Sequence, residues 1–297
     1  MRRGLLTGVA AYLIWGLFPL YWPLLEPAGA TEILAHRMVW SLVIMLLVLT
    51  AVRGWSELRR ASLRTWALVA AAAVLVSVNW GVYIYAVNHN QVVEAALGYF
   101  INPLVTVSLG VVVFAERLST RQWIAVLLGL AAVIVIATNS TRFPWVSLVL
   151  AASFAAYGLV KKVVRLPPTA SLTAEGMVQF LPAVVFLILL RTGGRDTLAG
   201  HGTGHVLLLA LSGVVTVIPL LAFAAAARAL PLSTLGLLQF LTPVTQFLLG
   251  VLWFHEHMPT ARWVGFGFVW VALIMLSVDG LAATRRSVRA RDHEMAQ

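Results

Sequence analysis

The sequence contains no cysteine and few charged residues for its length. Because none of the 297 residues is cysteine, disulfide bonds, thiolate zinc sites and thiol nucleophiles are excluded. Charged residues make up only 11% of the chain, too few to cover a water-soluble globule of this size. A Gly-Lys dipeptide is also absent, so the chain has no Walker A phosphate loop, which argues against ATP hydrolysis.

Two histidine pairs lack the setting that a metal site needs. His255 and His257 are two residues apart, which would point their imidazoles to different sides of a helix. His201 and His205 have helical spacing, but the glycines between them oppose a helix. No nucleophile and base are paired either, so we expect no metal, no cofactor and no enzymatic activity.

Hydrophobic residues are abundant. They make up 61% of the chain, and the mean hydropathy is +0.92, which indicates lipid as the natural solvent. One helical crossing needs about 20 apolar residues. The sequence therefore predicts an all-α integral membrane protein with ten transmembrane helices, at about 4–25, 32–52, 65–87, 92–115, 121–139, 144–161, 171–190, 205–227, 232–254 and 261–280. The first run has 22 uncharged residues, more than the about 7–15 of a cleaved signal peptide, so we expect it to be retained.

Basic residues are distributed unevenly between alternate span ends. Sixteen of the 21 lie at one set of ends, which includes both termini, and Lys and Arg favour the cytoplasmic side. We therefore predict a multi-pass protein of the bacterial cytoplasmic (inner) membrane with both termini in the cytoplasm. The same distribution accounts for the net charge of +10 without nucleic acid as a partner, because the basic residues form no continuous binding segment.

An internal repeat appears when the chain is shifted by 140 residues. Nine ungapped identities then fall within 24 positions: Phe100, Pro103, Leu109, Gly110, Val111, Phe114, Glu116, Thr120 and Trp123 match Phe240, Pro243, Leu249, Gly250, Val251, Phe254, Glu256, Thr260 and Trp263. We expect a first repeat at 1–141, a second at 142–281 and a basic cytoplasmic tail at 282–297. Because each repeat holds an odd number of crossings, five, the two are expected to be inverted, as in many transporters.

Three carboxylates, those of Glu94, Glu175 and Asp279, lie inside predicted spans, where a charge costs at least about 2.5 kcal/mol. Glu94 shares a helical face with Gly98 and Asn102, and Glu175 lies four residues before Gln179. We predict that both take part in coupling or gating, with hydrogen-bonded positions near the interface as the alternative. The neighbours His36 and Arg37 open the second span near its outer end, where they suit a gate, an anion contact or an interface anchor.

Prolines at equivalent repeat positions indicate interruptions at membrane depth. Pro103 and Pro243 each remove a backbone donor and free a carbonyl one turn back. Asn102, Gln239 and Thr242 add polar groups beside them. We predict helix breaks at both prolines and a substrate site between them, with ordinary kinks as the alternative.

Aromatic and amide residues are expected to line the same site. Asn79, Trp80 and Tyr83 lie in the third span, at positions that correspond to Pro219 and Phe223 of the eighth. Aromatic faces suit a cation, an aromatic amino acid or a flat drug-like solute, whereas plain interhelical packing would need no ligand.

Several motifs resemble the drug/metabolite transporter (DMT) superfamily, EamA family, RarD branch. The resemblance runs from about Gly4 to Asp279 and includes Ala11-Tyr12-Leu13-Ile14-Trp15-Gly16, His36-Arg37, Trp40-Ser41 and Ala86-Val87-Asn88. Its most specific block is Glu94-Ala95-Ala96-Leu97-Gly98-Tyr99-Phe100-Ile101-Asn102-Pro103-Leu104, which Leu232-Ser233-Thr234-Leu235-Gly236 echoes.

This resemblance implies a ten-helix carrier whose third, fourth, eighth and ninth helices surround a central cavity. In relatives, the glutamates that correspond to Glu116 and Glu256 usually follow a glycine, whereas Ala115 and His255 precede them here. The family's substrates are diverse, so the resemblance does not establish chloramphenicol or any other cargo.

The sequence therefore predicts a secondary transporter that moves a small organic solute by alternating access, with proton coupling through Glu94 as a hypothesis. The substrate site is expected to be lined by Asn79, Trp80, Tyr83, Tyr99, Asn102, Gln239 and Thr242. A passive channel and a non-transporting membrane sensor or scaffold are the alternatives. The sequence does not specify the substrate, the direction of transport, the coupling ion or the oligomeric state.

Overall fold

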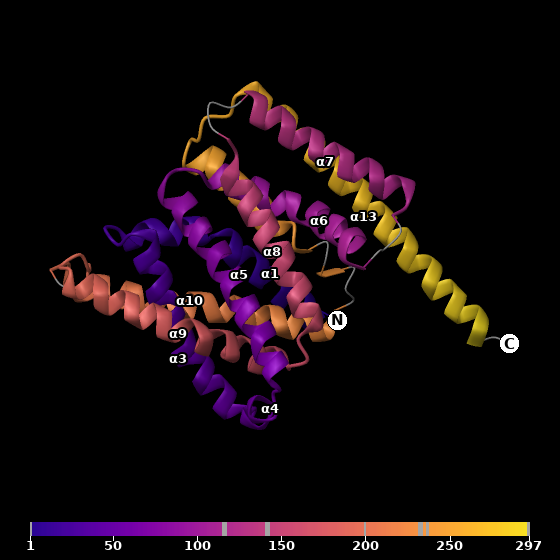
Figure 1. The fold of residues 1–297 in the computed structure, drawn as a ribbon. Coiled ribbons are helices and arrows are strands. Elements are labelled where there is room, and N and C mark those ends of the chain that lie inside the picture. Colours follow the sequence, from indigo (N-terminus) through magenta and orange to yellow (C-terminus); the bar gives the residue numbers. More distant parts are fainter. Residues whose placement is uncertain are drawn as a thin grey trace.

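The protein is mainly helical over the part of the chain that the computed structural model describes, which is residues 2–114, 118–139, 143–198, 200–230, 234–235 and 238–295 (Figure 1). Eight described helices contain a stretch long and apolar enough to cross a membrane. They are α3 (Ala30–Ala51), α5 (Leu63–Asn88), α6 (Val92–Phe114), α7 (Thr120–Asn139), α8 (Trp145–Val163), α9 (Pro168–Thr192), α10 (Gly202–Ala229) and α13 (Thr260–Met295). Each coincides with a predicted span, as expected for a multi-pass membrane protein.

The first and ninth predicted spans are not single straight helices. The first is divided at Leu17 into α1 (Arg2–Gly16) and the short helices α2 (Phe18–Tyr21) and η1 (Trp22–Leu25), with a bend of 45°. In the ninth, α12 (Leu241–Leu248) continues as the π-helical turn η2 (Leu249–Trp253), which together fall short of a full crossing. By length and composition the described helices provide eight crossings, or nine with the bent pair, so the count of ten remains a prediction.

Helices that are distant in sequence pack together. The short helix α4 (Trp55–Arg59) joins α3 to α5. The main contacts pair α3 with α9 and α10, α1 with α10 and α12, α5 with α8 and α9, and α6 with α8 and α12. The helices α7 and α13 lie side by side at one edge of the molecule (Figure 1).

Glycine permits the closest of these contacts. On α10, a Cβ atom built on Gly213 would lie 2.5 Å from the backbone carbonyl carbon of Trp40 on α3. On α6, a Cβ on Gly98 would lie 2.8 Å from the backbone oxygen of Ser147 on α8. Backbones meet at both points, so these contacts depend on the missing side chain.

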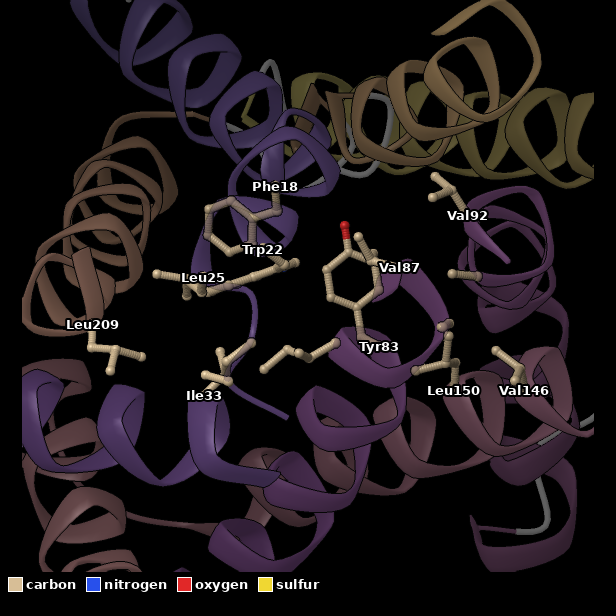
Figure 2. Packing of buried hydrophobic residues seen from close by; sticks show 14 residues of the cluster. Phe18, Trp22, Leu25, Ile33, Tyr83, Val87, Val92, Val146, Leu150 and Leu209 are labelled. Atoms are coloured by element: carbon tan, nitrogen blue, oxygen red, sulfur yellow. The ribbon is translucent and has the colours of Figure 1, made fainter. Parts of the chain in front are cut away.

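The largest buried cluster lies where these helix pairs converge. Trp22, Leu25, Ile33, Ile84, Leu150 and Leu209 are all fully buried there. Figure 2 shows Phe18 and Trp22 on one side of this cluster and Tyr83 facing them from α5. Tyr83, a member of this cluster, and Tyr99, which packs against it, also belong to the polar group described next.

Candidate functional site

Four polar side chains form a group inside the apolar interior, where α5, α6 and α12 meet. The Tyr99 hydroxyl donates a hydrogen bond to Asn79 Oδ1 at 3.1 Å, and Gln246 Nε2 donates to the Tyr83 hydroxyl at 2.9 Å. The two tyrosine rings pack edge to face with their centroids 5.7 Å apart. We call these four residues the polar cluster. It joins helices from both halves of the sequence.

The amide of Asn79 anchors the cluster to α8. Its Nδ2 donates to the backbone oxygen of Leu150 and to Ser153 Oγ, each at 3.0 Å. Asn79 is 1% exposed, so these bonds offset the desolvation of its amide. The structure thus brings together three residues predicted for the substrate site, Asn79, Tyr83 and Tyr99.

The glutamine of the polar cluster is Gln246, whereas Gln239 was predicted to line the substrate site. Gln246 is 1% exposed and also donates to the backbone oxygen of Trp15 at 3.3 Å. Gln239 lies in the turn before α12, and no described hydrogen bond joins its side chain to the polar cluster. A glutamine one turn before Gly250, followed directly by the apolar residues Phe247, Leu248 and Leu249, was the available signal.

The guanidinium of Arg37 lies beside the polar cluster. Its Nε donates to Thr216 Oγ1 on α10 at 2.8 Å, and its Cζ lies 3.9 Å from the ring centroid of Trp80 on α5. The rings of Trp22 and Phe18 lie 5.2 and 5.7 Å away. Two residues predicted separately, Trp80 for the cavity and Arg37 for a gate, are therefore in direct contact.

Thr242 and Asn102 lie elsewhere. Thr242 Oγ1 donates to the backbone oxygen of Tyr12 at 2.8 Å, next to the packed rings of Tyr12, Trp15 and Phe223. The side-chain oxygen of Asn102 is buried and has no hydrogen-bond partner among the described residues. The described hydrogen bonds link neither side chain to the polar cluster.

The predicted break at Pro103 does not occur, because α6 continues through it from Val92 to Phe114. Pro103 lacks the N–H that would bond the backbone oxygen of Tyr99, and a single missing donor is a small loss in a helix packed between α8 and α12. Pro243 lies in the first turn of α12, where backbone N–H groups have no acceptor within the helix, so the missing N–H of proline is not a loss there. The interruption in this region precedes Pro243, at Gln239 and Phe240.

Glu94 lies in the first turn of α6 and lines a small cavity of about 10 Å³, room for about one water molecule. The other lining residues are Val93, Leu97, Ile136, Pro144, Arg262 and Phe266. The backbone oxygen of Glu94 accepts a hydrogen bond from Ser147 Oγ at 2.6 Å. Glu94 is therefore placed at a helix end near a cation, and it is separate from the polar cluster.

Glu256, which sequence reasoning used only as a repeat marker, caps α6. Its carboxylate accepts hydrogen bonds from the backbone N–H groups of Val92 and Val93, the latter at 3.0 Å. It lies in the segment between η2 and α13, where burial is the main cause that raises its pKa to about 7. The preceding His255 has φ 50°, so a residue other than glycine here adopts the left-handed region that glycine adopts easily.

Glu175 is ion-paired. Its Oε1 lies 2.5 Å from Lys161 Nζ on α8, and its Oε2 accepts a hydrogen bond from the Tyr157 hydroxyl at 3.0 Å. Ser171 Oγ adds a further bond at 3.1 Å. The carboxylate predicted for coupling or gating thus has a cation and two hydroxyls as partners, and Lys161 and Tyr157 link it to α8.

His36 belongs to a second polar group, at the start of α3. One turn earlier, Glu32 Oε1 accepts hydrogen bonds from Thr197 N at 2.8 Å and from Thr197 Oγ1 at 3.1 Å. Thr197 Oγ1 also lies 2.7 Å from His205 Nε2. His36 is 4% exposed and interacts electrostatically with His205, so His36 and Arg37 have different surroundings despite being neighbours.

Comparison with known proteins identifies the family. Residues 2–138 and 143–278 each match the model of the EamA-like transporter family. The chain belongs to this family. Protein RarD of Streptomyces exfoliatus is 56% identical to this EamA protein over 292 residues, which cover 98% of the chain and 92% of that protein. YojE of Bacillus subtilis, an uncharacterized transporter, is 40% identical over 291 residues, covering 96% of the chain and 97% of that protein.

These relatives confirm the predicted assignment to the RarD branch of the DMT superfamily. This EamA protein is a membrane transporter and not an enzyme. A protein of known crystal structure, 17% identical, superposes with a TM-score of 0.60 over 93% of this chain and 96% of that one, so the fold is shared.

Proposed function

We propose that this EamA protein is a secondary transporter that moves a small organic solute across the bacterial cytoplasmic membrane by alternating access. The observation that carries the proposal is the hydrogen bond from Gln246 on α12 to the Tyr83 hydroxyl on α5. It joins the two sequence halves through polar groups buried among apolar helices. Polar side chains at this depth are costly, and in membrane proteins they mark substrate pathways.

The helix contacts support two equivalent repeats, at 1–141 and 142–281. The shift of 140 residues turns α1, α3, α5, α6 and α7 into α8, α9, α10, α12 with η2, and α13. Under this exchange the contact of α1 with α12 becomes that of α8 with α6, and α1 with α10 becomes α8 with α5. Similarly, α3 with α10 becomes α9 with α5. Such an exchange is what an inverted-repeat carrier needs to present its site to either side.

The proposed site is the polar cluster with Trp80 and Arg37, and the proposed proton carrier is Glu94. Glu94 and Arg262 of α13 line the same cavity, so a change in the charge of Glu94 would change its electrostatic interaction with Arg262. Asn102, Gln239 and Thr242 remain proposed lining residues of a rearranged state. The bias of basic residues supports both termini in the cytoplasm.

Counterflow tests the carrier mechanism. The purified protein is reconstituted in liposomes and loaded in turn with unlabelled amino acids, organic acids, amines or chloramphenicol, and uptake of the same labelled solute is followed. We expect saturable uptake of at least one solute, accelerated by that solute inside and reduced at least tenfold in Gln246→Leu. Val112→Ala, at an 80% exposed position of α6, is the matched control and keeps the wild-type rate.

A channel gives a different result. Flux that rises linearly with concentration and shows no counterflow would contradict alternating access. Absence of flux for every solute, in protein that retains a cooperative melting transition, would favour a sensor or scaffold and overturn the proposal.

A further inference from the structure

Arg37 is a buried charge without a carboxylate partner. It is 2% exposed, donates a hydrogen bond to Thr216 and lies against the rings of Phe18, Trp22 and Trp80. It also interacts electrostatically with Tyr83 and Tyr99, and it takes part in no salt bridge among the described residues. Its Nη1 is buried and has no hydrogen-bond partner. The guanidinium therefore keeps an unused donor in the interior.

Its depth makes this arrangement costly. Arg37 is the eighth residue of α3, so at a rise of about 1.5 Å per residue it lies about 10 Å along the helix from its start. A charge inside the hydrocarbon layer costs at least about 2.5 kcal/mol, and arginine keeps its proton under almost all conditions. Stacking on Trp80 offsets part of this cost, since a desolvated cation–π contact contributes about 2 kcal/mol.

The buried carboxylate of Glu175, unlike the guanidinium of Arg37, has a partner of opposite charge. It has Lys161 at 2.5 Å and further bonds from two hydroxyls, so its charge is compensated within the protein. Thr216 cannot do this for Arg37, because its hydroxyl already donates to the backbone oxygen of Ser212 at 2.8 Å and offers Arg37 only a neutral acceptor. The compensating charge for Arg37 is missing from the described residues.

We propose that the transported solute supplies this charge, and that Arg37 binds the carboxylate of an organic monoanion. This inference rests on the proposed function and adds the substrate class to it. The guanidinium has a planar set of donors that matches a carboxylate, and Nη1 is free to take part. Arg37 lies beside Trp80 on α5 and Thr216 on α10, so a solute bound there touches both sequence halves.

The surroundings define the rest of the solute. The rings of Phe18, Trp22 and Trp80 surround the guanidinium, and Tyr83 completes the aromatic wall that Figure 2 shows opposite Trp22. Among the described residues, Arg37 is the cation that contacts this aromatic wall, so the second negative charge of a dianion would have no cation to compensate it. We therefore assign an apolar or aromatic body carrying one carboxylate.

A matched set of probes tests this assignment. The full-length protein in detergent is melted with 3-phenylpropanoate, its neutral amide 3-phenylpropanamide, the cation 2-phenylethylammonium, or inorganic phosphate, all at constant ionic strength. We expect the carboxylate to raise Tm in a saturable way, because ligands that bind the native state stabilise it. The amide, the cation and phosphate should leave Tm within error of its value without ligand.

Variants link the effect to Arg37. In Arg37→Gln the carboxylate shift should vanish, and in Arg37→Lys, which keeps the charge but loses the planar fork, it should shrink yet remain larger than the amide shift. Arg191→Gln is the matched control, since Arg191 is exposed and paired with Asp196 at 3.4 Å, and it should keep the full shift. If Arg37→Gln does not fold, the Arg37→Lys comparison still decides.

Three results would overturn the assignment: stabilisation by the amide or the cation equal to that by the carboxylate, a full carboxylate shift in Arg37→Gln, or no shift with the carboxylate in the wild type. Counterflow keeps this outcome distinct from the carrier mechanism. Saturable counterflow of a neutral or cationic solute only would refute the anion and leave the carrier intact.

Discussion

The carboxylate of Glu256 accepts a hydrogen bond from the backbone N–H of Val93 at 3.0 Å, across 163 residues of sequence. This bond and its neighbour at Val92 hold the segment before α13 against the first turn of α6. Helix N-termini have unsatisfied N–H groups and a partial positive charge, so a carboxylate is a good cap there. The same turn carries Glu94, and the cap thus fixes the end of the helix that lines the small cavity.

Removing the cap should open this end of the protein. Replacing Glu256 with Ala leaves two N–H groups without their acceptor, a loss of about 1–2 kcal/mol, or roughly a 5–30-fold shift in the local opening equilibrium. The chain has no cysteine, so Leu97→Cys in the cavity wall provides a unique reporter. Labelling of that thiol by a water-soluble methanethiosulfonate in detergent should accelerate by this factor.

The exposed Glu26→Ala is the control for this change and should leave the labelling rate unaltered. Glu256→Gln keeps one acceptor oxygen and should give a smaller acceleration. Equal rates in wild type and Glu256→Ala would mean that the cap does not hold the end of α6.

Stability should fall as Glu256 ionises. Burial, with a smaller contribution from Glu94, raises its pKa from 4.5 to about 7 against the lowering effect of its two N–H donors and Arg262. A raised carboxyl pKa in the folded state means that its stabilising contribution is complete below about pH 4.5 and is lost as pH rises through 7. Glu256→Gln mimics the protonated form, so the difference in Tm, wild type minus variant, should decrease from pH 5 to pH 8. A difference that stays constant or grows would show that the group does not titrate in this range.

Breaking the pair between Lys161 and Glu175 should destabilise the protein more than removing both charges. Glu175→Gln leaves the Lys161 ammonium beside neutral partners, which we expect to cost about 1–3 kcal/mol because the lysine is only partly exposed. The double variant Lys161→Met, Glu175→Gln should recover most of this loss. A double-mutant cycle on Tm measures the coupling, and strict additivity would rule out a direct interaction.

Transport should respond in different ways to substitution of Glu94 and of Glu175. If Glu94 carries the coupled proton, Glu94→Gln abolishes the pH dependence of uptake in proteoliposomes and the response to an imposed pH gradient. Glu175→Gln should lower the rate but keep the pH profile, because its carboxylate is paired with Lys161. Glu57→Gln, on the exposed short helix α4, is the control. An unchanged pH profile in Glu94→Gln would favour facilitated diffusion or exchange.

A methyl group should have opposite effects at two glycines of α10. In Gly213→Ala the new Cβ meets the Trp40 backbone at 2.5 Å, and we expect a loss of about 1–3 kcal/mol through forced separation of α3 and α10. In Gly204→Ala the Cβ meets nothing within 4 Å, so the higher helix propensity of alanine should stabilise the folded protein by about 0.5–1 kcal/mol. Thermal melts of the two variants compare them directly, and similar effects of both would contradict the backbone contact.

Hydropathy was sufficient to locate the long helices, because burial in lipid demands a continuous apolar run with its backbone bonded internally. It could not distinguish a straight crossing from the bent pair at Leu17 or from the short helix α12 that ends in a π-helical turn. Both forms have the same composition, and the difference depends on which neighbouring helices support the freed backbone groups.

The candidate site was predicted in part. Asn79, Tyr83 and Tyr99 do come together, and Arg37 reaches Trp80, which no local pattern could indicate because these residues lie on different helices. Gln246 and Glu256 were missed for a related reason. Their roles come from contacts with Tyr83 and with the start of α6, and such contacts depend on how the helices pack, which residue spacing within one helix does not reveal.

The backbone contact at Gly213 has a consequence for movement. It fastens α10 to α3, while α1 packs on both α10 and α12, so these four helices form one block drawn from both sequence halves. Exchange of repeats gives the second block, α5, α6, α8 and α9, in which Gly98 fastens α6 to α8. The boundary between the blocks follows the contacts of α3 with α9 and of α6 with α12, and it passes between Gln246 and Tyr83 and between Arg37 and Trp80. Under the proposed alternating access, the rigid bodies that slide against each other would be these interleaved blocks, and the sliding surface would run through the residues assigned to the solute.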